Sequence, residues 1–196
     1  MARRYSSVHD LLLSLKELLA PNPGARADDV LEEVVEQLYR GRGYFWIGIY
    51  LAAGDKVIRQ CFRGPVPPCH SFALGVGNVG TTGQTGLTKV IPDVSSDPTY
   101  SMCFLETKSE LVQAIKIGSR ILGVIDVESD QLDAFSSQEQ VLLEQVADLL
   151  ARYLTTDQGK LLMRKAREKS HTVKAGTEPH KRPQPVRPGA NRAAAF

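Results

Sequence analysis

Two pairs of strand-like segments, each joined by a very short connection, constrain the fold of this chain most. Residues 44–51 are dense in aromatic and β-branched side chains, and an Ala-Ala-Gly-Asp turn separates them from a second such run at 56–62. Residues 111–117 and 120–129 form another pair, joined by a Gly-Ser dipeptide. Connections this short join antiparallel neighbours, because a parallel pair needs a crossover of a dozen or more residues. The sequence therefore predicts an antiparallel sheet.

Helical patterns precede these strands. Apolar residues recur with helical spacing from Val8 to Leu19, and Pro21 ends the run. A second helix is predicted over 30–39, where Asp29-x-x-Glu32 resembles an acidic capping box.

Another helical pattern follows the last strand. Ser136-x-x-Glu139 is a capping box, and an apolar stripe predicts a closing helix over 137–157. Helices, a strand pair, a loop region, a second strand pair and a helix therefore follow one another. This order is typical of the α+β class, with a central antiparallel sheet and the N- and C-terminal helices packed on one face.

The chain divides into a folded part and a basic tail. Residues 1–158 are predicted to form a single domain, with helices over 8–39, the sheet and its loops over 44–129, and the closing helix. From Lys160 onward the sequence has 10 Lys/Arg against 2 Asp/Glu and is rich in proline. Such a segment buries too little apolar surface to offset its ordering entropy, so residues 159–196 are expected to be a disordered, solvated tail rather than a nucleic-acid-binding one.

Composition excludes several classes of protein. No run of about 18 apolar residues and no signal-peptide pattern is present, which predicts a cytoplasmic protein without membrane contact. The three cysteines are Cys61, Cys69 and Cys103, an odd number that argues against a structural disulfide framework. Their spacing to one another and to histidine does not fit zinc, so no metal is expected. The cysteines are therefore expected to be either buried free thiols or residues that take part in redox chemistry.

A glycine-rich stretch, PPCHSFALGVGNVGTTGQTG, follows the first strand pair. Residues 75–80 fit the dinucleotide pattern GxGxxG, which needs the strand and helix of a parallel βαβ unit. The preceding strands form a hairpin instead, and Gly83 and Gly86 weaken any helix that would follow. The context excludes a Rossmann site, and we expect a loop.

Strand alternation places three aromatic side chains on one face, because residues two apart in a strand share a side. Tyr44, Trp46 and Tyr50 lie together there, with Gly48 as a gap between them. The pattern indicates a floor on which a small molecule could rest.

Acidic side chains form a second candidate group. Asp126 and Glu128 share a face of the last strand, and Glu110 opens the neighbouring strand. Burial of such acids is costly unless a cation relieves their repulsion; alternatively, they mark where the strand leaves the sheet. If floor and carboxylates converge, the ligand has a polarizable apolar part and a cationic group, as an amino acid with a thioether-like side chain has.

Several blocks in the right order resemble the GAF domain family. They are FWIGIYL, C-x5-G-x-G-x2-G-T, VIPDV, MCFLETKSELV, and ILGVIDVES followed by FSSQEQ, and they cover roughly residues 44–154. Within that family the blocks are similar to the free methionine-R-sulfoxide reductases.

The resemblance implies roles for two cysteines. Cys103 falls at the position of the family's catalytic cysteine, and Cys69 at that of a resolving cysteine. The chain departs from the family at Val79, where another cysteine is common, and this puts recycling in doubt. No role is assigned to Cys61.

The resemblance also implies a substrate pocket. Trp46 and Tyr50 match the aromatic wall that encloses the substrate methyl group. Glu110, Asp126 and Glu128 match the carboxylates that hold the amino group and assist protonation of the sulfoxide. Glu128 stands where the family usually has Asp, a longer side chain of the same charge.

The implied activity is reduction of free methionine-R-sulfoxide through a sulfenic acid and an intramolecular disulfide. No bound cofactor is expected, because thioredoxin or a similar thiol donor supplies the reducing equivalents. Two alternatives remain: a non-catalytic GAF module that binds a small ligand or a partner chain, and a degenerate enzyme that binds without turnover. A homodimer through the helical face is a further expectation.

Overall fold

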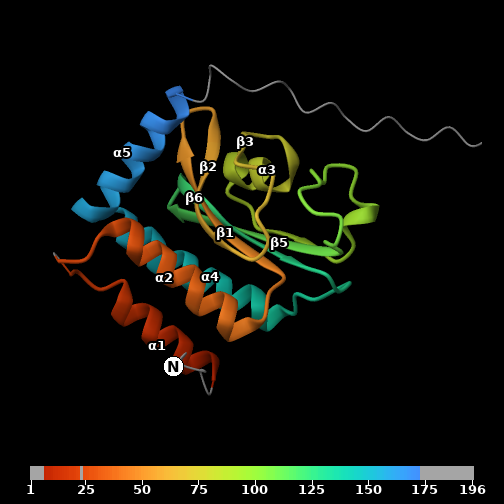
Figure 1. The fold of residues 1–196 in the computed structure, drawn as a ribbon, viewed down its shortest axis with the longest axis horizontal. Coiled ribbons are helices and arrows are strands. Elements are labelled where there is room, and N and C mark those ends of the chain that lie inside the picture. The colour runs from red at the N-terminus through yellow and green to blue at the C-terminus, as the bar shows by residue number, and fades with distance from the viewer. Residues whose placement is uncertain (1–6, 23, 173–196) are drawn as a thin grey trace, which may run out of the picture.

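The computed structural model describes residues 7–22 and 24–172 of the chain (Figure 1). In chain order its elements are α1 (Val8–Leu18), α2 (Ala27–Arg42), β1 (Trp46–Ala53), β2 (Lys56–Arg63), β3 (Ser71–Ala73), α3 (Gly77–Thr85), β4 (Lys89–Ile91), the 3₁₀-helix η1 (Val94–Ser96), β5 (Ser109–Ile117), β6 (Arg120–Ser129), α4 (Ser137–Leu154) and α5 (Asp157–Thr172).

The strands form one antiparallel sheet in the order β3-β2-β1-β6-β5-β4. Both predicted hairpins are present: Ala53 lies opposite Lys56 at the first turn, and Ile117 lies opposite Arg120 at the second. Pairing of β1 with β6 joins the two hairpins at the centre of the sheet. The predicted α+β class with a central antiparallel sheet is confirmed.

Helices α1, α2, α4 and α5 lie on one side of the sheet, and α3 with the long loops lies on the other (Figure 1). The main apolar core fills the space between the four helices and the sheet. In α4, Leu142, Val146 and Leu150 are buried because side chains three or four residues apart share a helix face. Burying each such side chain contributes about 1.5–3 kcal/mol.

A smaller apolar cluster lies on the opposite face of the sheet, beneath α3. Its buried members are Trp46, Tyr50, Val57, Phe72, Val79, Phe104, Val112 and Val124. Cys69 and Cys103 pack against this cluster while remaining partly exposed. The face that the main core leaves free therefore carries the predicted aromatic and thiol groups.

The prediction of a disordered tail from residue 159 is wrong for its first part. The closing helix ends at Leu154, and α5 follows directly over Asp157–Thr172. It buries Leu162, Met163 and Ala166 in the main core. These few apolar residues stand among many charged ones, so their tertiary contacts contribute most of the stability of the helix. Residues 173–196 of the predicted tail lie outside the described residues.

Part of the glycine-rich stretch forms a helix rather than the predicted loop. α3 spans Gly77–Thr85 and ends at Gly86, which has a left-handed φ of 69°. At Gly80 a Cβ atom would lie 2.1 Å from the carbonyl oxygen of Ala73, so only glycine lets the helix lie this close to β3. The glycines serve close packing here, which offsets their poor helix propensity.

The start of α2 also differs from its prediction. The helix begins at Ala27, and its N-cap, Arg26, makes no side-chain cap hydrogen bond. The predicted capping box is wrong, because Glu32 pairs with Arg63 on β2 instead. Glu32 therefore forms an ion pair across the helix–sheet interface instead of a local capping hydrogen bond.

The predicted aromatic floor differs from the structure at Tyr44, because β1 begins only at Trp46. Tyr44 precedes the strand, so alternation does not reach it, and its hydroxyl bonds to Glu139 in the helix-side core. Phe45 packs instead on the side of Trp46 and Tyr50. The floor therefore loses Tyr44 and gains Phe45.

Candidate active site

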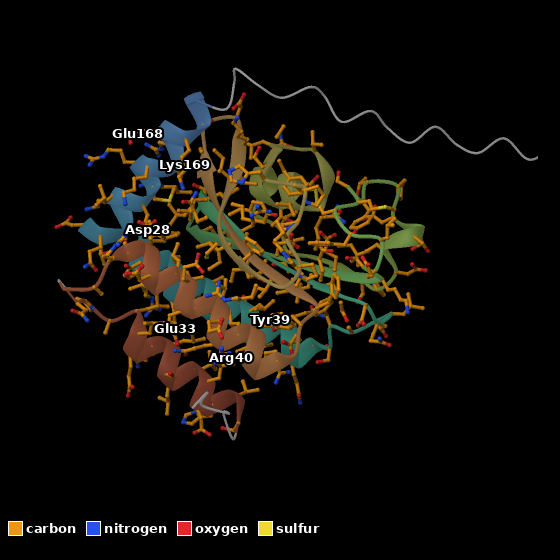
Figure 2. All side chains as sticks on the ribbon, in the orientation of Figure 1. Asp28, Glu33, Tyr39, Arg40, Glu168 and Lys169 are labelled. Atoms are coloured by element: carbon orange, nitrogen blue, oxygen red, sulfur yellow. A yellow bond between two sulfur atoms is a disulfide. The ribbon has the colours of Figure 1, made fainter. Side chains whose placement is uncertain are left out.

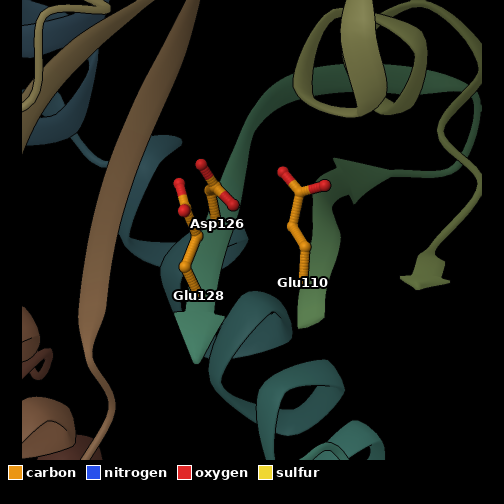
Figure 3. Close-up of side chains that lie close together, drawn as sticks. All are labelled: Glu110, Asp126 and Glu128. Carbon is orange, nitrogen blue, oxygen red and sulfur yellow. The ribbon is translucent and has the colours of Figure 1, made fainter. Parts of the chain in front are cut away.

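The three predicted carboxylates lie side by side near the open end of the β5–β6 hairpin. Glu110 on β5 pairs with Glu128 on β6, and Glu128 pairs in turn with Trp46 on β1. Asp126 lies two residues earlier on β6, so its side chain shares the same face (Figure 3). One oxygen from each carboxylate lies within 4.8 Å of the others. Sheet register alone brings residues from two strands into one acidic group.

All three carboxylates are buried, which makes their charged forms costly. Their exposed fractions are 3%, 2% and 3% for Glu110, Asp126 and Glu128. Burial, followed by the charge of Glu128, raises the pKa of Glu110 to about 8. Burial raises the pKa of Glu128 to about 7, and burial with both neighbouring charges raises the pKa of Asp126 well above its usual value. The group therefore holds protons at neutral pH and favours a cation.

Hydrogen bonds hold two of the carboxylates in place and leave part of the third free. Asn78 of α3 donates from Nδ2 to Glu110 at 2.6 Å, and the Thr107 hydroxyl donates to Glu128. Oδ1 of Asp126 is buried and has no hydrogen-bond partner within the described part of the chain. An unpartnered buried acceptor indicates a place for a ligand donor.

Asn78 also connects the carboxylates to the loop that carries Cys103. Its Oδ1 accepts from Nζ of Lys89 at 2.5 Å and from the Thr99 hydroxyl at 3.1 Å. This network fixes the first turn of α3 above the carboxylates.

An aromatic wall borders the acidic group. The Trp46 indole lies across Gly48, where a Cβ atom would come within 2.2 Å of its ring. The ring centroid of Trp46 lies 6.3 Å from that of Tyr50 and 5.9 Å from that of Phe104. The gap predicted at Gly48 is therefore filled by the indole.

Two donors near the wall have no partner among the residues that the structure describes. They are Nε1 of Trp46 and the hydroxyl of Tyr100, both buried. Burial and the nearby charges of Glu128, Glu110 and Asp126 raise the pKa of Tyr100, so this hydroxyl stays protonated. The site thus offers free donors as well as a free acceptor.

Cys69 and Cys103 form a disulfide with a Cα–Cα distance of 5.8 Å. Cys69 lies two residues before β3, and Cys103 lies in the loop before β5, so the bond joins segments 34 residues apart in sequence. Arg59 donates from Nη1 to the carbonyl oxygen of Cys69 at 2.6 Å. Cys61 is a free thiol in the helix-side core, where burial raises its pKa, so it stays protonated and inert.

The structure brings all seven predicted site residues to one face of the sheet. Sequence reasoning missed three polar neighbours, Asn78, Tyr100 and Thr107. Asn78 lies in the glycine-rich stretch, where its polarity among small residues was the available signal. Tyr100 and Thr107 lie in an irregular loop, where strand and helix periodicity give no information about orientation.

A surface cleft of about 280 Å³ lies elsewhere, between α1 and α4. Its floor is formed by Leu12 and Leu149, and its rim includes Lys16, Asp148 and Arg152. These helices cover the opposite side of the sheet from the carboxylates (Figure 1), so the cleft does not belong to the acidic site. None of the helices in the described residues is both long and apolar enough to cross a membrane.

Fold and site together define an α+β domain with a buried cluster of acidic and aromatic side chains beside a disulfide. Residues 26–154 match the GAF domain family, and the chain therefore belongs to it. A relative, GAF domain-containing protein A of Dictyostelium discoideum, is 33% identical over 121 residues, which are 61% of this chain and 76% of the relative.

Reductases are also among the similar proteins. The free methionine-R-sulfoxide reductase of Saccharomyces cerevisiae is 33% identical over 109 residues, which are 54% of this chain and 60% of that protein. The solved structure of the Neisseria meningitidis free methionine-R-sulfoxide reductase, in complex with its substrate, has a TM-score of 0.73. It is 23% identical and aligns over 83% of this chain and 98% of its own, a likeness of fold.

Proposed function

We propose that this chain reduces free methionine-R-sulfoxide to methionine, with Cys103 as nucleophile and Cys69 as resolving cysteine. The observation that carries the proposal is the Cys69–Cys103 disulfide beside the buried carboxylates and the aromatic wall. A thiol pair able to close, next to a pocket for a cationic and polarizable molecule, is what this reaction needs. The reductases among the relatives support it.

The pocket suits a free amino acid. The carboxylates hold the α-ammonium group, because a cation relieves the cost of their burial. The N-terminus of α3 has no side-chain cap, so its backbone N–H groups offer donors for the α-carboxylate. Trp46 and Tyr50 receive the methyl and sulfur groups, since aromatic rings favour polarizable neighbours. A peptide-bound methionine lacks both charges and fits poorly.

The chemistry begins with the thiolate of Cys103, which attacks the sulfoxide sulfur. A protonated carboxyl group, of raised pKa, gives a proton to the oxygen, which moves to Cys103 as hydroxyl. Methionine leaves and a sulfenic acid remains on Cys103. Cys69 then attacks this sulfur and expels water, which forms the disulfide. Overall, one sulfoxide and two thiols give methionine, one disulfide and water.

The departure at Val79 is compatible with this cycle. Val79 is 2% exposed on α3 and belongs to the apolar cluster beneath it. The disulfide in the structure joins Cys69 and Cys103, so the cycle as proposed needs no cysteine at position 79.

The test is a thioredoxin-coupled assay of NADPH oxidation with the free R sulfoxide, the free S sulfoxide and a peptide-bound form. Turnover is expected with the free R form alone. Cys103→Ser should abolish turnover while methionine binding, measured by calorimetry, persists. Binding without turnover in the wild-type chain would favour the alternative, a non-catalytic ligand-binding GAF module or a degenerate enzyme.

A further inference from the structure

The two most exposed large apolar side chains of the described residues lie beside the disulfide. Leu105 is 85% exposed and Val66 is 81% exposed, and Met102 nearby is 55% exposed. Scattered apolar side chains are normal on a protein surface, but a group around one reactive bond marks an interaction site.

The positions of these residues follow from the chain itself. Val66 lies three residues before Cys69, and Leu105 lies two residues after Cys103. Because a residue spans at most about 3.6 Å, both side chains are attached within about 11 Å of a bonded cysteine. We call Val66, Met102 and Leu105 the apolar rim.

Local structure holds the apolar rim in the solvent. Phe104 turns inward, with its ring centroid 5.5 Å from that of Phe45, whereas Met102 and Leu105 in the same loop stay exposed. Pro67 and Pro68 follow Val66 and restrict the backbone there. Neither Val66 nor Leu105 belongs to either apolar cluster, so both side chains are free to contact a partner.

Positive charge gathers on the Cys69 side of the apolar rim. His70, the exposed neighbour of Cys69, has a lowered pKa. Burial is the main cause, and the nearby positive charges of Arg59, Lys169 and Lys56 add to it. Lys169 stands on α5 (Figure 2). This edge of the molecule is complementary to an acidic partner.

We propose that the apolar rim is the docking surface for the protein that reopens the disulfide, namely a dithiol protein with an apolar, acid-bordered face around its reactive cysteine. This inference rests on the proposed function, which requires a reductant. A small surface suits it, because redox encounters are transient and bury little area.

The exchange at this surface is balanced within the two proteins. A thiolate of the partner attacks one sulfur of Cys69–Cys103, so that a mixed disulfide forms and the other cysteine leaves as thiolate. The second thiol of the partner then attacks the mixed disulfide. The partner loses two electrons and two protons, and the two cysteines of this chain gain them.

The test follows reduction of the disulfide directly, without methionine sulfoxide. Full-length oxidised protein is mixed with reduced thioredoxin, quenched with an alkylating agent, and the labelled thiols are counted by mass spectrometry. The double variant Val66→Ser/Leu105→Ser should be reduced about tenfold more slowly, the effect of losing about 1.4 kcal/mol of interaction. Leu13→Ser, which removes an exposed leucine from α1 on the other side of the sheet, should be reduced at the wild-type rate.

Dithiothreitol provides the matched chemical control, since a small dithiol needs no docking surface. It should reduce wild type and double variant at equal rates, and added salt should slow thioredoxin but not dithiothreitol. The proposal would be overturned if thioredoxin reduced the wild type and the double variant at equal rates. It would also be overturned if the double variant were slowed by the same factor with dithiothreitol, or if salt left the rate with thioredoxin unchanged. Because no sulfoxide is present, failure of the proposed function leaves these results unaffected.

Discussion

Replacing Glu110 by Gln removes one of three acids that the folded chain buries in a single group. The substituted side chain keeps an oxygen that can accept the 2.6 Å hydrogen bond from Asn78, so the change removes charge with little change of shape. We expect Glu110→Gln to stabilise the substrate-free protein at alkaline pH, because the carboxylate it removes is charged and buried there.

The magnitude follows from the pKa of Glu110, which rises from an ordinary 4.5 to about 8. One pKa unit corresponds to about 1.4 kcal/mol, so the whole difference is worth about 5 kcal/mol. A raised pKa means that the folded state binds the proton more tightly, so stability is greatest below the unfolded-state pKa and falls as pH rises toward the folded-state value. Between about pH 5 and pH 8 the wild type should lose about 3 kcal/mol that Glu110→Gln retains.

The assay is urea unfolding with the disulfide intact, repeated across this pH range. Glu106→Gln, which changes an exposed acid in the loop just before β5, serves as control and should follow the wild type. A wild-type stability that is flat or rising from pH 5 to 8, or a Glu110→Gln curve parallel to it, would refute the reasoning that these acids are held protonated by burial.

Three further changes test other parts of the structure. Cys69→Ser should allow one turnover and then stall with a sulfenic acid on Cys103, which a dimedone adduct would report in mass spectrometry; continued turnover with thioredoxin would show that another thiol resolves. Tyr100→Phe removes a buried hydroxyl that has no partner in the described chain, and it should lower kcat about 10-fold with little change in KM; an unchanged kcat would exclude that hydroxyl from the reaction. Leu150→Ala in α4 should destabilise the protein by about 2–5 kcal/mol in denaturant unfolding while methionine binding persists, because this buried side chain lies in the helix-side core; a loss below about 1 kcal/mol would contradict the tight packing of that layer.

The sheet and the acidic group could be predicted because both depend on local pattern. A two-residue alternation places Asp126 and Glu128 on one face, and a short turn brings β5 beside β6. Glu110 lies at the start of β5, so the same hairpin places it near the other two acids. These are statements about neighbours in sequence or across one hairpin.

The missed features depend on tertiary contacts that no local pattern records. α5 is helical because Leu162 and Met163 reach the core, although its composition is that of a solvated segment. α3 is helical because Gly80 lets it approach Ala73, although its composition is that of a loop. Tyr100 points into the site from irregular backbone, where sequence spacing gives no direction.

α5 has a practical consequence for any attempt to isolate the GAF domain. The family match ends at residue 154, whereas the main core continues into α5, which is further tied to α2 by the pair of Lys165 with Asp28. Cutting the chain at the boundary of the match would expose the apolar core residues that Leu162 covers. It would also leave the carbonyl oxygen of Ala53 without the hydrogen bond that the Ser170 hydroxyl donates. The packed core thus extends past the segment that the family model matches, and fusions or truncations belong beyond Thr172.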